Sequence, residues 1–387
     1  MAHRAAIVGA GHTRFGVLDD GPRALVRSAV EAAFASVDAG AERKDVSEAF
    51  LATLGFGGSQ IGNSSAVLAE EAGVVGIPVT RVENACASGG FALRSAVGAL
   101  AARASPLVLV VGVEKMTDVS NARRRYWLGV SGDTEWERLA GLTFAGVYGL
   151  IASRYFTEHG DASEALAEVA VKNHDNGALN PNAHFQKRIT RAEVRSAPLV
   201  ADPLGLYDCC PVSDGAVALL LSAPEIAHKF TDAPVYVDGL GAGTDPLAVQ
   251  ERAKLTSFRA TQRAAHEAFR SAGWNRSDIS FLEVHDCFTI AELLALEDLG
   301  FAGPGEAAAL TLSGETRRDG RLPVNPDGGL KSKGHPIGAT GVSQAYEIFL
   351  QLRGEAGSRQ VSHAGHALAH NVGGAGATAA VTLFSVG

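Results

Sequence analysis

The sequence predicts an α/β protein built from two duplicated α/β halves. Short apolar segments alternate with helical stretches along its 387 residues, and such alternation is typical of sheets covered by helices. The same order of segments then returns: residues 235–239 resemble 5–9, and residues 278–282 echo 45–47. Matching segments in the same order and at similar spacing indicate a tandem duplication. We therefore expect two units with mixed or mostly parallel sheets.

The first half alternates strands with helices. The spacing of apolar residues predicts helices over 22–37 and 64–73. The apolar run 106–113 is too short to span a bilayer and suits a buried strand. The other segments expected to contain strands are shorter: 5–9, 45–51, 77–80 and 214–221.

The second half repeats this order to the end of the chain. Residues 267–269 echo 31–34 on a helix, and 323–325 match 78–80. The chain closes on 376–383, a strand of small residues like the one that ends the first half. Each of these segments of the second half therefore corresponds to a segment of the first half.

An insertion between Met116 and about Val200 has no counterpart in the second half. It is more polar and aromatic than its surroundings, and helical stretches are expected at 142–156 and 163–173. An insertion next to a site is a natural cap for a substrate. The domains expected are an N-terminal half, an inserted cap and a C-terminal half: residues 1–117 with 201–225, residues 118–200, and residues 232–387.

Composition excludes several classes of partner and compartment. The formal net charge of −8 and the lack of a basic run exclude a nucleic-acid-binding role, and no segment indicates a membrane partner. The four cysteines at 86, 209, 210 and 287 are too scattered for a disulfide framework or a structural zinc site. The N-terminal apolar segment is too short for a signal peptide, and the last residues carry no peroxisomal address. We expect a cytoplasmic protein.

The stretch around Cys86 is the first candidate for chemistry. Polar residues precede it, small residues follow it, and residues 91–100 continue at helical spacing. This pattern predicts a cysteine at the first turn of a buried helix, where free N–H groups and the helix dipole favour a thiolate. The stretch alone is equally compatible with a small buried hydrophobic residue.

Three loops in the second half could complete a site. Residues 334–341 occupy the position that matches the Cys86 loop and lead into a helix at 342–352. Residues 284–288 end a strand, and residues 370–374 are expected to form a tight turn before the last strand. Loops at strand ends are where α/β folds gather their sites. Each half therefore presents a reactive group at the start of a helix.

These loops resemble those of the thiolase superfamily, and the likeness covers essentially the whole chain. Residues 84–89 resemble the nucleophile loop, and Gly334-His335-Pro336 resembles the family's histidine loop. His285-Asp286-Cys287-Phe288 replaces the usual Asn-Glu-Ala-Phe, while Asn371 and Gly373 stand at the cysteine and glycine of the late Cys-x-Gly motif. These departures resemble sterol-carrier-protein thiolases and archaeal acetoacetyl-CoA thiolases. The resemblance implies a thiolase-like fold with two α/β halves in five layers and an inserted loop domain.

The resemblance also implies an acyltransferase that forms or cleaves 3-ketoacyl-CoA through an acyl-cysteine. Cys86 is the expected nucleophile and His335 its base. The N–H groups of Cys86 and Gly373, in the turn that includes Asn371, are expected to bind the first oxyanion. His285 with His335 would bind the second thioester, and Cys287 would move the proton at the α-carbon. Coenzyme A thioesters are the expected substrates, with no covalently bound cofactor and no metal.

Three alternatives stay open. Some thiolase-like subunits are aldolases on acyl-CoA side chains, although a retro-aldol step needs no acyl-enzyme and therefore no Cys86. A lipid-carrier or scaffold subunit would be expected to lose the catalytic set. A ketosynthase-like condensing enzyme pairs its cysteine with two histidines, as Cys86 with His285 and His335 would; consumption of a malonyl thioester with release of CO₂ would identify it.

The remaining candidates have structural or assembly roles. His184, His363 and His366 are expected to be structural, as is the Cys209-Cys210 pair before a core strand. Asp286 is expected to cap or orient its neighbours. The resemblance implies a homodimer formed through a sheet edge that includes 106–113. It also suggests a partner subunit with an OB-fold and a bound zinc ion.

Overall fold

The computed structural model describes residues 3–55, 63–102 and 107–387. Within these residues, nine strands form one sheet in the order β3-β2-β4-β7-β1-β8-β11-β10-β9. The strands are β1 (Ala5–His12), β2 (Val46–Ala52), β3 (Val79–Val82), β4 (Leu107–Glu114), β7 (Gly215–Ser222), β8 (Val235–Thr244), β9 (Phe281–Glu283), β10 (His366–Gly373) and β11 (Thr378–Val386). A separate small hairpin pairs β5 (Leu199–Ala201) with β6 (Leu204–Gly205).

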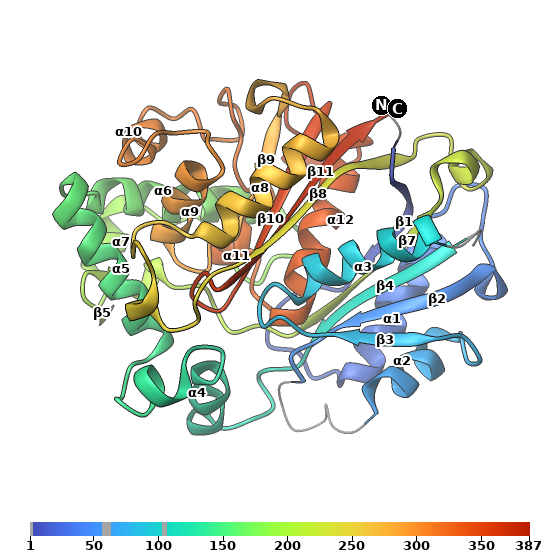
Figure 1. Cartoon of the computed structure of the whole chain (residues 1–387), viewed down its shortest axis with the longest axis horizontal. Helices are drawn as coiled ribbons and strands as arrows, with labels where there is room; N and C mark the ends of the chain where they lie inside the picture. The colour runs from blue at the N-terminus through green and yellow to red at the C-terminus, as the bar shows by residue number, and fades with distance from the viewer. Residues whose placement is uncertain (1–2, 56–62, 103–106) are drawn as a thin grey trace.

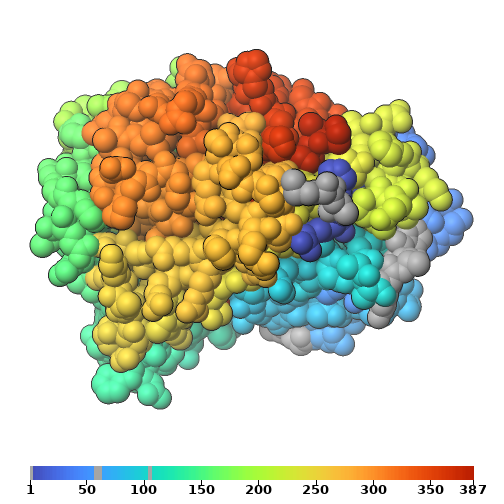
Figure 2. Space-filling model, turned by 45° about the horizontal axis from the view of Figure 1, so that its top comes forward, coloured from blue at the N-terminus to red at the C-terminus, as the bar shows by residue number. Residues whose placement is uncertain are grey.

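The sheet joins two half-sheets edge to edge. β1 and β8, the first strand of each half, pair antiparallel from Ala5 opposite Val237 to Ile7 opposite Val235. Both chain ends meet at this junction, where Asp238 accepts hydrogen bonds from the hydroxyl of Ser385 and from the ring of His3. Figure 2 shows this contact as dark blue N-terminal residues beside the red C-terminal segment.

Helices cover and separate the two half-sheets, which gives the five layers expected from the sequence (Figure 1). α1 (Pro22–Ala35) and α2 (Ser64–Ala72) cover the first half-sheet, and α8 (Arg259–Ala272) covers the second. α3 (Ser88–Ala102) and α12 (Thr340–Leu352) pack against each other between them. Side chains from both halves share this middle layer, including Phe50, Leu93, Ile348 and Phe384.

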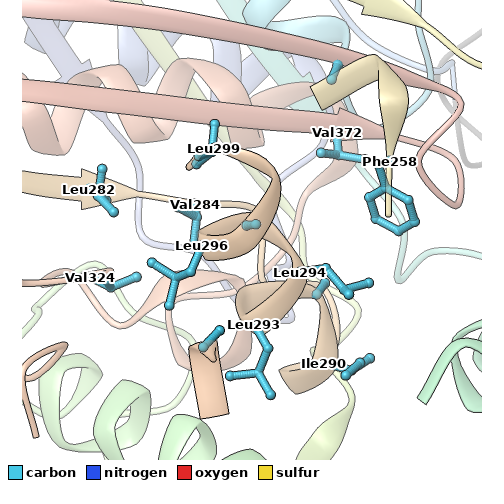
Figure 3. Close-up of a cluster of buried hydrophobic side chains, with 14 of the residues drawn as sticks. Phe258, Leu282, Val284, Ile290, Leu293, Leu294, Leu296, Leu299, Val324 and Val372 are labelled. Atoms are coloured by element: carbon cyan, nitrogen blue, oxygen red, sulfur yellow. The ribbon is translucent and has the colours of Figure 1, made fainter. Parts of the chain in front are cut away.

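The inserted segment forms a helical layer beside the second half. It contains α4 (Asn121–Gly129), α5 (Phe144–His159), α6 (Ser163–Gly177) and α7 (Arg191–Ser196), so both predicted helices are present. Of these helices, α5 and α6 pack against α9 (Thr289–Asp298), and α6 also packs against α10 (Ala307–Leu312) and α11 (Gly329–Ser332). Figure 3 shows the apolar core around α9, whose Leu293, Leu294 and Leu296 belong to the same buried cluster as Leu282, Val284 and Val324. The exact domain boundaries stay a prediction.

Several expectations from the sequence need correction. Residues 370–374 are not a turn, because β10 continues to Gly373. The segment 323–325, expected to match β3, makes only a single bridge, between Leu282 and Val324. The edge of the first half-sheet is β3, whereas β4 lies inside the sheet between β2 and β7. Pro106, the first residue of the run 106–113, lies outside the described residues. Gly57 and Gly58, in the segment before α2, lie outside them as well.

One apolar stretch resembles a membrane span by length and composition. It covers Ala85–Ala102, and 56% of it is buried inside the protein. Its helix, α3, packs against β4 and α12 in the middle layer. This environment is that of a core helix.

Substitution of Gly89 tests the contact between α3 and α12. A β-carbon at Gly89 would lie 2.7 Å from the backbone nitrogen of Val342. We expect Gly89→Ala to lower the free energy of unfolding by about 1–3 kcal/mol through overpacking, and to lower activity because Cys86 moves with α3. Denaturant titration measures the first effect.

Gly98→Ala is the matched control on the same helix. No atom lies within 4 Å of the β-carbon it would add, so we expect it to stabilise the protein by roughly 0.5–1 kcal/mol. Equal effects of the two substitutions would contradict a specific close approach at Gly89.

Candidate active site

A sharp turn between β3 and α3 presents Cys86. Ala85 has φ +48°, a conformation that non-glycine residues rarely adopt. The Ser88 hydroxyl holds the turn by accepting from the Asn84 N–H at 2.9 Å and donating to the Ala85 carbonyl at 2.6 Å. α3 begins at Ser88, so Cys86 lies just before the first helical turn. Its side chain is buried, with 3% of the residue exposed.

His335 is held in one tautomer. Its Nδ1 lies 2.7 Å from the Thr340 hydroxyl, which donates its own hydrogen to the Pro336 carbonyl at 2.9 Å. Because a hydroxyl has a single hydrogen, Thr340 must accept from Nδ1–H. The free lone pair of His335 is therefore on Nε2, as a general base requires.

The structure brings three of the predicted residues together. The sulfur of Cys86 and one ring nitrogen each of His285 and His335 lie within 4.8 Å of one another. The two rings meet edge to face, with centroids 5.0 Å apart and an angle of 84°. All three side chains are buried. Segments from both halves thus form one reactive centre.

Asn371 and the two glycines that follow Val372 pack against the nucleophile turn and His285. The Asn371 amide contacts three groups: the N–H of Gly90 at 3.0 Å, the carbonyl of Cys86 at 2.9 Å and Nδ1 of His285 at 3.3 Å. Two backbone N–H groups face the Cys86 sulfur: that of Cys86 itself, as predicted, and that of Gly374, one residue beyond the predicted Gly373. A β-carbon at Gly373 would lie 2.3 Å from the Asn84 carbonyl oxygen, so this strand approaches the nucleophile turn closely.

Asp286 anchors the loop that carries His285 and Cys287. Its carboxylate accepts from the N–H of Leu330 at 2.7 Å and from the side chain of Asn173 at 2.7 Å. The orienting role expected for Asp286 agrees with these contacts. Cys287 itself is buried.

Two residues of the site were missed or underrated by the sequence analysis. Tyr148 on α5 is fully buried, stacks on Phe288 with centroids 4.4 Å apart and turns its hydroxyl toward the Cys287 sulfur. Cys210, expected to be a structural linker residue, donates its N–H to the Cys287 carbonyl at 3.0 Å. A tyrosine at an apolar position of a helix looks like an ordinary core residue, so the sequence did not point to Tyr148. The Cys209-Cys210 pair was the only sequence feature that pointed to the surroundings of Cys287.

Burial makes the resting site electrically neutral. It raises the pKa of Cys86 to about 12 and lowers the pKa of His335 to about 3. The pKa of Cys287 is likewise raised by burial, and that of His285 is lowered far below its usual range. Burial of Cys86 therefore opposes the resting thiolate that the helix start was expected to favour.

The same neutrality bears on metal binding. One thiol and two imidazoles at this spacing resemble a zinc ligand set. A bound metal would displace the thiol proton of Cys86, so its affinity would fall as the pH is lowered. The same thiol beside two neutral imidazoles also suits acyl transfer, in which charge develops only during the reaction.

A cavity of about 330 Å³ opens beside the catalytic loop. Phe185, Ile189 and Tyr207 supply an apolar wall, and Lys187 and Lys331 supply positive charge. Cys210 lines the cavity and also contacts the Cys287 backbone. The cavity therefore shares a wall with the reactive centre and is within the size range of ligand pockets.

Comparisons with known proteins agree over the whole length. A family model described as the N-terminal domain of thiolase matches residues 5–225, and one described as thiolase C-terminal domain-like matches residues 241–386. The chain is 44% identical to an acetyl-CoA acetyltransferase of Methanothermobacter thermautotrophicus, covering 98% of this chain and 99% of that one. It is 33% identical to sterol carrier protein 2 of Gallus gallus, covering 100% and 72%.

A solved structure extends these similarities. The structure titled Ltp2-ChsH2(DUF35) aldolase superposes with a TM-score of 0.86 at 26% identity, covering 98% of this chain and 97% of that one.

The pH dependence of Cys86 alkylation tests the neutral resting state. Because burial raises the pKa of Cys86 to about 12, the thiolate fraction grows about tenfold per pH unit below that value. The rate of modification by iodoacetamide should therefore rise continuously between pH 7 and pH 10. Peptide mass spectrometry separates Cys86 from the other cysteines. A plateau near pH 7 would indicate a thiolate–imidazolium pair instead.

Proposed function

The chain belongs to the thiolase family and is a thiolase-type acyltransferase that uses coenzyme A thioesters, and we propose that Cys86 carries the acyl group. The observation that carries this proposal is the convergence of Cys86, His285 and His335 within 4.8 Å in a neutral, buried centre. Each group comes from a different segment, and each is held by its own hydrogen bonds or turn.

In the acyl-transfer step, His335 removes the thiol proton as Cys86 attacks the thioester carbonyl. The Nδ1–H bond to Thr340 leaves Nε2 free for this proton. Backbone N–H groups of Cys86 and Gly373 bind the oxyanion in the proposal, and Gly374, whose N–H faces the sulfur, is a further donor. The leaving thiolate of coenzyme A takes the proton back from His335.

In the carbon–carbon step, Cys287 handles the proton at the α-carbon. When a 3-ketoacyl chain is cleaved, the departing enolate needs a proton, and burial keeps the Cys287 thiol protonated by raising its pKa. His285 stabilises the enolate oxygen, and His335 does so while its Nε2 holds the thiol proton taken from Cys86. The thiol of the incoming coenzyme A restores the proton of Cys287, and in condensation the Cys287 thiolate is the base that removes the α-proton.

The cavity beside Cys210 is the proposed entry for the thioester arm. Its apolar wall suits a pantetheine chain, and Lys187 at its rim suits the phosphates of coenzyme A. Cys210 joins this cavity to the loop of Cys287. The arm would therefore arrive on the side where the carbon–carbon step takes place.

An aldolase function is the second candidate, because one structural neighbour is titled as an aldolase. A retro-aldol reaction requires no acyl-enzyme. The buried Cys86 with its paired His335 base favours acyl transfer over this alternative. Trapping of an acyl-cysteine separates the two functions.

Acylation of Cys86 is the central test of the proposal. After the protein is mixed with acetyl-CoA, intact-protein mass spectrometry should show one acetyl adduct, which peptide mapping assigns to Cys86. Cys86→Ala should lose turnover. An adduct on Cys287, or normal turnover of Cys86→Ala, would refute the assignment.

Cys287→Ser should separate the two half-reactions. The serine hydroxyl is a much weaker acid than a thiol, so the carbon–carbon step should slow by about 10²-fold or more. Acylation of Cys86 should persist, because Cys287 has no part in that step. Rapid-quench measurement of each half-reaction decides the outcome, and an equal loss in both would contradict the specific role of Cys287.

The oligomeric state of the protein, a partner subunit and its location in the cell are further proposals. We propose a homodimer through the edge strand β3, which among the described strands pairs only with β2, because a strand edge favours pairing with a second chain. We also propose a partner subunit with an OB-fold and a bound zinc ion, and the neighbour whose title names ChsH2(DUF35) supports a partner of the DUF35 kind. Light scattering of the purified chain should give twice the monomer mass, and activity should increase when such a partner is added. A monomer, or full activity alone, would contradict the respective proposal. A cytoplasmic location stays a prediction.

A further inference from the structure

We propose that Asn371 is a positioning residue that fixes the proton of His285 on Nε2 and so makes this ring a hydrogen-bond donor to the substrate oxygen. The inference rests on the proposed function of His285 in the carbon–carbon step. It begins with the three contacts of the Asn371 amide, which come from two halves of the fold.

The orientation of the amide follows from its backbone partners. The N–H of Gly90 is only a donor, so the group that faces it at 3.0 Å must be Oδ1. The Cys86 carbonyl is only an acceptor, and Nδ2 donates to it at 2.9 Å. A reversed amide would break both contacts, so Nδ2 also faces His285.

The tautomer of His285 follows from this orientation. Nδ2 lies 3.3 Å from Nδ1 of His285, and it brings its second hydrogen to that atom. Nδ1 must then accept, which leaves the ring proton on Nε2. Because burial lowers the pKa of His285, the ring stays neutral and carries that single proton.

The Nε2–H group has no partner among the described residues. It is buried and makes no hydrogen bond to the protein. An unsatisfied buried donor costs on the order of 1–3 kcal/mol, so a site that retains one has a use for it. The proximity of this ring to Cys86 and His335 places the donor where a thioester or enolate oxygen would lie.

Tight packing prevents the amide from turning. A β-carbon at Gly341 would lie 2.2 Å from Oδ1 of Asn371, and one at Gly90 would lie 3.2 Å from its Cβ. Asn371 is therefore wedged between the first turns of α12 and α3. Two glycines provide the room that this amide occupies.

The direct test is the tautomer of His285 in the wild-type protein. Nitrogen-15 NMR of histidine-labelled protein distinguishes a protonated ring nitrogen from an unprotonated one, and His285→Gln assigns the signal. We expect a protonated Nε2 and an unprotonated Nδ1. The opposite pattern would overturn the proposal whether or not the protein proves to be a thiolase, because this readout needs no turnover.

The isosteric variant Asn371→Asp provides the functional test. An ionised aspartate cannot donate to Nδ1, so the proton of His285 should move to Nδ1 and leave Nε2 as an acceptor. Loss of one oxyanion donor should slow the carbon–carbon step by about 10²–10³-fold. Acylation of Cys86 should change by only a few fold, since His335 keeps its bond to Thr340.

Gln360→Glu is the matched control, because Gln360 lies beyond the C-terminal end of α12 and, like Asn371, accepts from a backbone N–H (Ala356) and donates to a backbone carbonyl (Gln351). It should leave the tautomer of His285 and the ratio of the two half-reaction rates unchanged. An Asn371→Asp protein that keeps both the Nε2 proton and the wild-type carbon–carbon rate would overturn the proposal. So would an equal slowing of both half-reactions without a change of tautomer.

Discussion

The close approach of α3 and α12 is the constraint on which the site depends. Gly89 packs against the backbone of Gly341 and Val342, and no β-carbon fits between them. Helix axes that approach this closely place the turns before both helices side by side. The turn before α3 carries Cys86, and the turn before α12 carries His335. The glycines in this contact therefore determine the distance between nucleophile and base.

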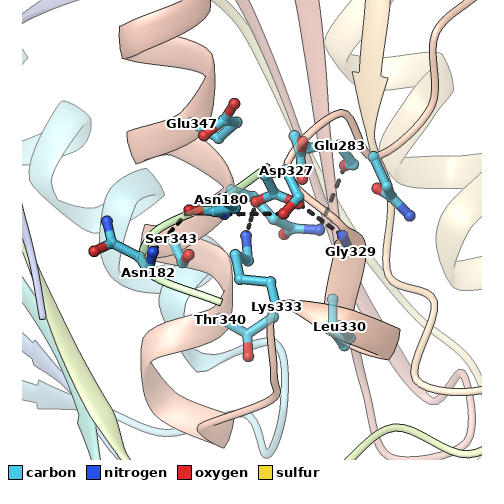
Figure 4. Close-up of polar contacts among 12 residues, drawn as sticks. Asn180, Asn182, Glu283, Asp327, Gly329, Leu330, Lys333, Thr340, Ser343 and Glu347 are labelled. Atoms are coloured by element: carbon cyan, nitrogen blue, oxygen red, sulfur yellow. Dashed lines mark hydrogen bonds and ion pairs between the residues drawn. The ribbon is translucent and has the colours of Figure 1, made fainter. Parts of the chain in front are cut away.

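The site also depends on a buried network of charged side chains next to His335, outside the reactive centre itself. The segment that precedes His335 is anchored by a buried ion pair between Lys333 and Asp327, which Figure 4 shows with the N–H of Gly329 donating to the same aspartate. Glu283 lies in the same cluster, and burial raises the pKa of its carboxyl. This buried support fixes the chain two residues before His335, whose ring is held by Thr340. The reactive centre itself stays neutral at rest, so desolvation does not destabilise a permanent charge there.

The sequence predicted what lies near in the chain and missed what packing brings together. Cys86 was predicted because small residues and a helical pattern follow it, and His335 because its loop matches the Cys86 loop in the repeat and resembles the family's histidine loop. The three contacts of Asn371 were not predicted, because Asn371 lies 285 residues from its partner Cys86 in the chain. Tyr148 gave no signal because its effect depends on α5 packing against Phe288. The sequence analysis expected the helix start to lower the pKa of Cys86, whereas burial raises it. The burial of a turn depends on tertiary packing, which the local sequence does not show.

The duplication explains why the second half carries most of the chemistry. Where the first half has the edge strand β3, the second half retains a single bridge at Val324. Asn325 follows this bridge with φ +54°, and its Oδ1 accepts from the N–H of Val284 at 2.8 Å. The lost strand is thus replaced by a side chain that supports the loop of His285 and Cys287. In the first half the corresponding strand precedes the nucleophile turn, so the repeat diverges where one half provides the nucleophile and the other provides proton transfer.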